Sequence, residues 1–164
     1  MKISLPGTVR VGPFRHTHGL LGEIPPELGE LSSLELLNLR HNNLLGEIPP
    51  ELGELSNLMR LDLSYNYLSG EIPPVLGELS SLEELNLFYN ELSGEVPPEM
   101  GDLSSLVTLV LSANYLSGEI PASFPALDGL DTLRFGDNQG LCAPNTSTFT
   151  SWFEGMSWSS GPWC

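Results

Sequence analysis

Five leucines, each 24 residues from the next, most strongly constrain the fold of this chain: Leu34, Leu58, Leu82, Leu106 and Leu130. Each begins the same pattern, L-x-x-L-x-L/F-x-x-N, so the chain repeats a structural unit of fixed length. A period of about 20 to 50 residues is typical of a solenoid, in which each unit buries its apolar face against its neighbours. The period therefore predicts one stack of similar turns, which offers an extended surface and no enclosed cavity.

One turn of the repeat, residues 82–105, illustrates what each part is expected to do. Leu85 and Leu87 flank Asn86 at the spacing of a β-strand, so the leucines face one way and the residue between them faces the other. An asparagine follows at the bend of every turn, where its amide can hydrogen-bond backbone groups that have no partner in a sheet. These structural asparagines are Asn42, Asn66, Asn90, Asn114 and Asn138.

The second half of each turn is expected to leave the strand. Residues 92–97 read Leu-Ser-Gly-Glu-Val-Pro, and close variants recur in the other turns. The glycine suits a bend, the β-branched residue suits burial, and the proline blocks further strand hydrogen bonding. Residues 49–55 place leucines at positions i and i+3 after a proline pair, which predicts a short 3₁₀ or helical turn.

The full pattern, L-x-x-L-x-L-x-x-N-x-L-S-G-x-I-P-x-x-L-G-x-L, resembles the plant-type extracellular leucine-rich repeat of receptor kinases, receptor-like proteins and polygalacturonase-inhibiting proteins. It covers residues 20–141 as about five turns in register. The resemblance implies an α/β leucine-rich-repeat solenoid. Such a solenoid is a right-handed superhelix with a concave parallel β-sheet, short second strands, and 3₁₀ or helical turns on the convex side.

The two ends of the chain depart from the repeat. Residues 1–19 align poorly with it, although Val9, Val11 and Phe14 suggest an edge strand, and we interpret this segment as a degenerate or truncated N-terminal cap. Residues 142–164 hold all three tryptophans together with Phe149 and Phe153. Because the last turn of a solenoid exposes its apolar core, these rings predict a C-terminal cap.

Cys142 and Cys164 are the only cysteines, and both lie in the C-terminal segment. One disulfide closing a loop of about 20 residues is the simplest account, and the chain-entropy estimate gives it roughly 3 kcal/mol of stabilisation. Two buried free thiols are the alternative, whereas a metal site would need more ligands than two cysteines without nearby histidines. The segment resembles the cysteine-containing cap of secreted family members, which implies an oxidising compartment and an extracellular or cell-surface location.

The charge of the chain narrows the choice of partners. Asp and Glu number 21 against 6 Lys and Arg, which gives a net charge of −15. Nucleic acid and anionic membranes are disfavoured because they attract clustered basic residues, whereas a basic partner or bound cations would fit the field. The sequence contains no run of 18 apolar residues, which is about the length needed to span a membrane. The start lacks the apolar core of a signal peptide, so the chain is either intracellular or has had a leader removed. The two cysteines favour removal of a leader.

Solvent-facing residues on the concave strands change type from turn to turn, unlike the repeated positions. Exposed aromatics beside arginine are typical of interface anchors. Strands about 4.8 Å apart would bring the aromatic residues of neighbouring turns into one patch, which Tyr67 and Tyr115 extend along the flank. The predicted partner-binding residues are Arg60, Asp62, Tyr65, Glu84, Asn86, Phe88 and Tyr89. The alternative is that the rings only cover neighbouring aliphatic side chains.

Acidic residues recur elsewhere in the turn at the same interval of 24. The longest column is Glu23, Glu47, Glu71, Glu95 and Glu119. The ordinary interpretation is a solvated convex face that keeps the chain soluble and prevents sideways association, so we expect a monomer. The alternative is weak binding of Ca²⁺ along these columns.

Catalytic chemistry has little support in the sequence. The three histidines are not spaced with Ser or Cys as in a nucleophile–base pair. Asp62, Glu83 and Glu84 suggest a carboxylate pair of the glycosidase kind, but an open surface is a poor place to raise the pKa of a carboxyl group. No phosphate loop or dinucleotide motif is present. We therefore expect neither enzyme activity nor a cofactor.

These patterns together predict a non-enzymatic module that recognises a protein or peptide on its concave face, with inhibition of an enzyme as one subclass. An ice- or surface-binding solenoid is an alternative, for which Ser69, Ser93 and Ser117 form a column. A structural or engineered scaffold is another, because residues 22–32 and 46–56 are identical. Asn145, in Asn-Thr-Ser, is a candidate glycosylation site in a secreted chain.

Overall fold

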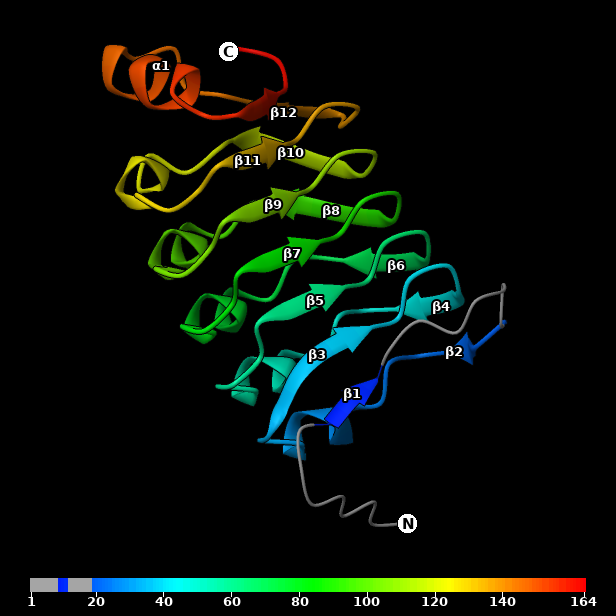
Figure 1. Cartoon of the computed structure of the whole chain (residues 1–164). Coiled ribbons are helices and arrows are strands. Elements are labelled where there is room, and N and C mark those ends of the chain that lie inside the picture. The colour runs from blue at the N-terminus through cyan, green and yellow to red at the C-terminus, as the bar shows by residue number, and fades with distance from the viewer. Residues whose placement is uncertain (1–8, 12–18) are drawn as a thin grey trace.

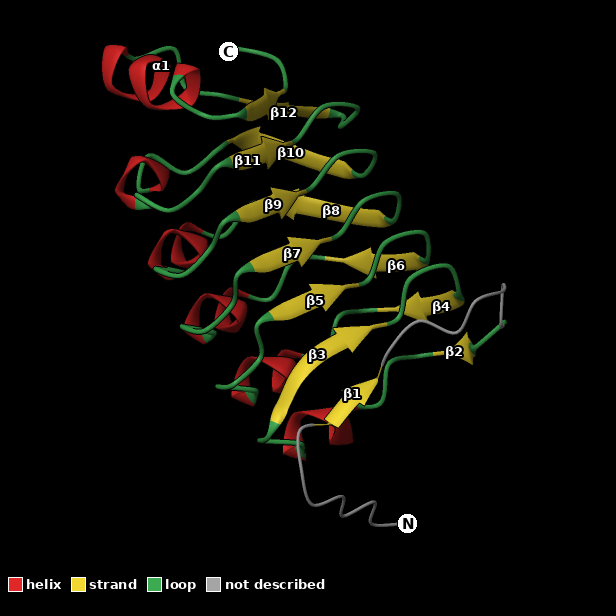
Figure 2. Cartoon of the chain, in the orientation of Figure 1, coloured by secondary structure: helices red, strands yellow, loops and turns green. Residues whose placement is uncertain are grey.

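The computed structural model describes residues 9–11 and 19–164 as one stack of similar turns (Figure 1). Each full turn contains a strand of a first sheet, a bend, a strand of a second sheet and a 3₁₀ turn (Figure 2). The α/β solenoid predicted from the repeat is therefore confirmed. Phe14, which was assigned to an edge strand, lies outside the described residues.

The larger sheet has seven parallel strands in the order β1-β3-β5-β7-β9-β11-β13 and forms the concave side. Its strands are β1 (Val9–Val11), β3 (Leu34–Asn38), β5 (Arg60–Asp62), β7 (Glu84–Asn86), β9 (Thr108–Val110), β11 (Thr132–Arg134) and β13 (Trp158–Ser160). Within the repeats, neighbouring strands pair at an offset of one period, as Arg60 pairs with Glu84 and Asp62 with Asn86. Residues at the same place in successive turns therefore form columns.

The smaller sheet follows the bends and has six parallel strands in the order β12-β10-β8-β6-β4-β2. These are β2 (Leu21–Gly22), β4 (Asn43–Gly46), β6 (Tyr67–Gly70), β8 (Glu91–Glu95), β10 (Tyr115–Glu119) and β12 (Gly140–Cys142). The 3₁₀ turns are η1 (Pro26–Glu30), η2 (Pro50–Glu54), η3 (Pro74–Glu78), η4 (Pro98–Asp102) and η5 (Phe124–Ala126). The first four begin at a proline, whose missing N–H is not needed at the start of a helix.

Leucines fill the space between the two sheets and the 3₁₀ turns. Leu61, Leu63 and their equivalents one turn later have no exposed surface, and each buried leucine contributes about 1.5–3 kcal/mol. The 3₁₀ turns also pack closely, because a Cβ added at Gly77 would overlap the carbonyl oxygen of Glu99 in the next turn. Repetition of leucine and glycine is therefore a requirement of stacking.

The bend asparagines form a ladder of hydrogen bonds between turns, as predicted. The Asn90 amide nitrogen donates to the carbonyl oxygens of Leu63 (3.1 Å) and Leu87 (3.2 Å), and its oxygen accepts from the backbone N–H of Leu68 (3.1 Å). The same three bonds recur at Asn66 and Asn114. One buried side chain thus satisfies backbone groups at the bend that would otherwise lack partners.

Aromatic rings close the C-terminal end of the core. Helix α1 (Ser147–Glu154) begins at the N-cap Thr146, whose hydroxyl accepts from the backbone N–H of Phe149. Phe153 contacts Phe135 of the last repeat with ring centroids 5.9 Å apart, and Trp163 covers Phe153 at 5.2 Å. The predicted aromatic cover is confirmed for these rings; the Trp158 side chain lies outside what the structure describes.

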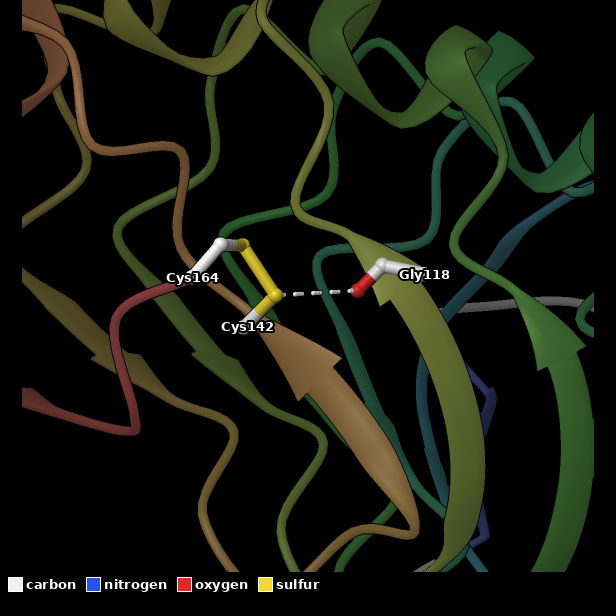
Figure 3. The surroundings of a disulfide bond; sticks show 3 residues. All are labelled: Gly118, Cys142 and Cys164. Atoms are coloured by element: carbon white, nitrogen blue, oxygen red, sulfur yellow. Dashed lines mark hydrogen bonds between the residues drawn. A yellow bond between two sulfur atoms is a disulfide. The ribbon is translucent and has the colours of Figure 1, made fainter.

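A disulfide between Cys142 and Cys164 ties the end of the chain to strand β12 (Figure 3), with sulfurs 2.08 Å apart. The predicted bond is confirmed, and the alternative of two free thiols is wrong. A disulfide sulfur carries no proton, so the 3.7 Å approach of Cys142 Sγ to the Gly118 oxygen is a contact and not a donated hydrogen bond. The cap also extends both sheets, through β12 and β13.

Candidate recognition surface

All seven predicted partner-binding residues come from two neighbouring strands and the bends that follow them. Arg60 and Asp62 lie in β5, opposite Glu84 and Asn86 in β7. Tyr65, Phe88 and Tyr89 lie in the two bends. The structure therefore brings the seven residues onto one surface, while their role in binding stays a prediction.

The rings of Tyr65, Phe88 and Tyr89 form one cluster. The Tyr65 ring centroid lies 5.2 Å from Phe88 in an edge-to-face arrangement and 5.5 Å from Tyr89. His41, from the preceding turn, stacks on Tyr65 at 4.2 Å, and the Arg40 guanidinium lies 5.2 Å from the Tyr65 centroid. These separations are those of favourable aromatic and cation–π pairs. The cluster is thus larger than predicted.

The backbone at the bend adopts a left-handed conformation that the sequence did not reveal. φ is +56° at Tyr65 and +57° at Tyr89, and the equivalent residues His41, Ala113 and Asp137 have values of +55° to +58°. Residues other than glycine, asparagine and aspartate seldom adopt this conformation, and a bulky ring there is unusual. The backbone alone would favour glycine, so the aromatic side chains are not explained by the geometry of the bend.

Asp62 and Asn86 also have a local structural role, while their role in binding stays a prediction. Asp62 accepts from both the backbone N–H (3.0 Å) and the hydroxyl (2.6 Å) of Ser64. Asn86 accepts from the backbone N–H of Phe88 at 3.1 Å. Both side chains therefore shape the bend that carries the rings, by the local hydrogen bonding common to Asp and Asn.

Arg60 and Glu84 form an ion pair across the two strands, with Arg60 Nε and Glu84 Oε2 separated by 3.9 Å. Both side chains are well exposed, at 59% and 41%. Water screens such a pair, which contributes about 0–1 kcal/mol. Arg60 and Glu84 are therefore accessible to a partner, and the fold depends little on their attraction.

A depression of about 530 Å³ opens beside the aromatic cluster. Five successive turns and the C-terminal cap contribute its lining residues. These are Arg40, Tyr65, Asn86, Phe88, Val110, Ser112, Arg134, Asp137, Ser159 and Ser160. Two arginines and one aspartate are its charged side chains. The local charge is thus opposite in sign to the net charge of the chain.

Three of the seven predicted residues, Tyr65, Asn86 and Phe88, line this depression. Sequence reasoning did not assign Ser159 and Ser160 to the surface, because the cap contains no repeat that would place them. Ser160 pairs with Arg134 where β13 continues the concave sheet. No pattern in the sequence signalled that extra strand.

None of the other candidate positions lines the concave depression. Tyr67 and Tyr115 are exposed at 52% and 49% on the second sheet. The Ser93 and Ser117 hydroxyls lie 3.4 Å from the carbonyl oxygens of Gly70 and Gly94, so they turn toward the backbone of the preceding turn. Asn145 is exposed just before α1.

Neither a membrane-spanning helix nor a cluster of metal ligands is found among the described residues. No helix within residues 9–11 and 19–164 is long and apolar enough to cross a bilayer. In the same part of the chain, no three His, Cys, Asp or Glu side chains are grouped as ligands of a metal ion would be. The acidic columns therefore carry no assembled cation site in the described structure.

The structure is a repeat solenoid, with stacked parallel turns and a ladder of asparagines at the bends. Its strands present an open surface, as they do in repeat proteins that bind other molecules. Two family models, both described as leucine-rich repeat, match residues 32–92 and 105–127. The chain belongs to the leucine-rich-repeat family, and its repeats are of the plant extracellular type. No protein with a curated description matches the sequence at a significant level.

Solved structures of plant receptor ectodomains resemble the chain closely. The ectodomain of the Arabidopsis thaliana membrane receptor kinase GASSHO1/SCHENGEN3, solved with CASPARIAN STRIP INTEGRITY FACTOR 2, is 36% identical, with a TM-score of 0.79 over 88% of this chain and 17% of that one. The Arabidopsis receptor kinase HAESA, solved with the peptide hormone IDA and the co-receptor SERK1, is 35% identical, with a TM-score of 0.78 over 86% and 24%.

A shorter ectodomain, that of BIR2 from Arabidopsis thaliana, is 40% identical, with a TM-score of 0.67 over 77% of this chain and 66% of that one. The chain thus spans about a quarter or less of the first-named receptor ectodomains. Both matching family models describe repeats, and neither describes an enzyme.

Proposed function

We propose that the chain is a non-enzymatic recognition module that binds a protein or peptide on its concave face. The observation that carries the proposal is the cluster of Tyr65, Phe88 and Tyr89 beside the depression. The two tyrosines occupy left-handed positions, where the equivalent residues of later turns are Ala113 and Asp137. Since the fold accepts small or polar residues there, the rings serve a purpose other than folding.

The chemistry of the surface suits an extended peptide segment. Phe88 and Val110 offer apolar contacts, while Arg40 and Arg134 suit a carboxylate or carbonyl group of the ligand. The net charge of −15 would at the same time attract a partner that is basic overall. Peptide ligands are supported by the HAESA structure, which was solved with the peptide hormone IDA.

We place this module outside the cell or at the cell surface, as a monomer. The Cys142–Cys164 disulfide supports an oxidising compartment, and the receptor ectodomains that resemble the chain support the same location. Asn145 is exposed and would accept a glycan there. The exposed acidic columns would keep separate copies of the chain apart.

Selection of a displayed library of random peptides on the immobilised chain tests the proposal. A selected peptide should bind Phe88→Ala at least ten-fold more weakly than the wild type, because truncation of a central aromatic anchor typically costs about 2 kcal/mol or more. Val107→Ala is the matched control, since Val107 is 43% exposed, immediately precedes β9 of the same sheet and does not line the depression. Equal affinities of the two variants would contradict binding at the aromatic cluster.

A further inference from the structure

We propose that a second site, on the flank of the stack, binds a neutral carbohydrate ring. A depression of about 230 Å³ lies where the bends lead into the second sheet. His41, Asn42, Asn43, Tyr65, Asn66, Tyr67 and Tyr89 line it. This inference concerns a different class of ligand and does not depend on peptide binding at the concave depression.

The aromatic residues of this flank site are not needed for stacking. Tyr67 occupies a column in which the other turns carry Asn43, Glu91, Tyr115 and Gln139, and all five side chains are exposed. A polar residue therefore satisfies the fold at this position. The column of rings that begins at His41 ends at Tyr89, because the equivalent residue of the next turn is Ala113. No ring from that turn therefore covers the outer face of Tyr89, which is 58% exposed.

Several polar groups of the flank site have no hydrogen-bond partner among the described residues. The Asn42 and Asn66 amides are occupied, since each donates to a backbone carbonyl oxygen at 2.8–2.9 Å. In contrast, the Asn43 amide and the Tyr67 and Tyr89 hydroxyls make no hydrogen bond to another described residue. Amides and phenols both donate and accept, so these three groups can bond the hydroxyls of a ligand.

The residues that line the flank site determine which class of ligand it can bind. No Asp, Glu, Lys or Arg lines it, so the site has no permanent charge to bind a phosphate, sulfate or carboxylate, and His41 is its one ionisable residue besides the tyrosines. A purely apolar ligand would cover the amide and phenol groups without hydrogen-bonding them, which is costly. A sugar ring meets both demands, because its C–H face packs on an aromatic face and its hydroxyls bond to the rim. Few polar groups around aromatic walls are typical of ligand pockets.

Two sources supply this chemistry, a fragment of a neutral polysaccharide and the glycan of a glycoprotein. Calorimetric titration should use cellohexaose and chitohexaose for the first source and a released high-mannose glycan for the second. Binding of either group at millimolar concentration is the expected result, and the preferred group identifies the source. Hexagalacturonic acid, which is anionic, should bind at least ten-fold more weakly.

Tyr67→Ala tests the location of the site, and Tyr115→Ala is its matched control. Both tyrosines occupy the same place in their turns and are about equally exposed, but only Tyr67 lines the depression. We expect Tyr67→Ala to lower oligosaccharide affinity at least ten-fold, as loss of a stacking ring does elsewhere, and Tyr115→Ala to leave it unchanged. Thermal melting checks that both variants fold.

Three results would overturn the inference: no titration heat with any of the neutral oligosaccharides, equal loss in the two tyrosine variants, or tighter binding of hexagalacturonic acid. Val110→Ala separates this inference from the peptide-binding proposal. Since Val110 lines the concave depression and not the flank site, that variant should retain full oligosaccharide affinity whether or not it still binds a peptide.

Discussion

Two ladders run side by side along the bends of this molecule, one of asparagines and one of rings. The asparagine itself is present in all five turns, and Asn66, Asn90 and Asn114 are buried. The residue immediately before each asparagine is His, Tyr, Tyr, Ala or Asp, although its backbone conformation is constant to within 3° in φ. The fold therefore requires the asparagine of each bend, whereas it leaves the side chain before the asparagine free to vary, and that is where we propose that a ligand binds.

The largest effect should follow from breaking the asparagine ladder. Asn90→Ala removes three hydrogen bonds and leaves the buried N–H of Leu68 without a partner, while the carbonyl oxygens of Leu63 and Leu87 keep only their bonds from Asn66 and Asn114. We expect the free energy of unfolding in urea to fall by about 3 to 5 kcal/mol. Asn43→Ala, an exposed control at the start of β4, should change it by less than about 0.5 kcal/mol. A mild effect of Asn90→Ala would refute the structural role of the ladder.

Removal of the C-terminal tie should have the next largest effect. A double substitution, Cys142→Ser with Cys164→Ser, opens a loop with a sequence separation of 22. The chain-entropy estimate predicts a loss of about 3 kcal/mol, measurable as a lower midpoint of urea unfolding. Treatment of the wild type with a reductant should reproduce this loss, and treatment of the double variant should have no effect. Sensitivity of the double variant to reductant would contradict the assignment.

Substitution of Tyr89 should change the unfolding free energy less, and the direction of the change should depend on the residue introduced, because φ is positive at this position. Tyr89→Gly should change the unfolding free energy by less than about 1 kcal/mol, because relief of the left-handed backbone offsets the lost ring contacts. Tyr89→Val should be less stable than Tyr89→Gly by about 1–2 kcal/mol, since a β-branched residue resists positive φ. Equal stability of the two variants in urea would show that the bend carries no strain.

The Arg60–Glu84 pair should matter least to the fold. Arg60→Ala removes one partner of an exposed ion pair, and we expect a loss of less than about 0.5 kcal/mol that becomes smaller still as NaCl is added. Thermal melting at low and high salt measures it. A loss that persists unchanged in concentrated NaCl would mean that Arg60 acts through packing and not through charge.

Most of the fold could be predicted from the sequence, because the same leucine and asparagine positions recur in every turn. Leu85, Leu87 and Asn90 recur with the period, and the physics of burial assigns each a place. The disulfide followed from two cysteines in one short segment. The predicted neighbourhood of Tyr65, Phe88 and Tyr89 also followed, since in-register parallel strands bring equivalent positions side by side.

The remainder of the site could not be predicted, for reasons that are specific to its residues. Positive φ at Tyr65 and Tyr89 was missed because no glycine precedes the asparagine. Asp62 and Asn86 were taken as contact residues, although local hydrogen bonds turn them toward their own bends. Ser159 and Ser160 reach the depression through a strand of the cap, where no repeat fixes the register.

The most direct test measures stability and recognition on the same samples of a Tyr65→Ala/Phe88→Ala double variant and of Val107→Ala. If rings recognise and asparagines hold the fold, the double variant should lose at least a hundred-fold in affinity for a selected peptide. Its unfolding free energy should fall by no more than about 2 kcal/mol, the scale of the lost ring pairs. Full affinity in the double variant, or loss of fold and binding together, would contradict this division of roles.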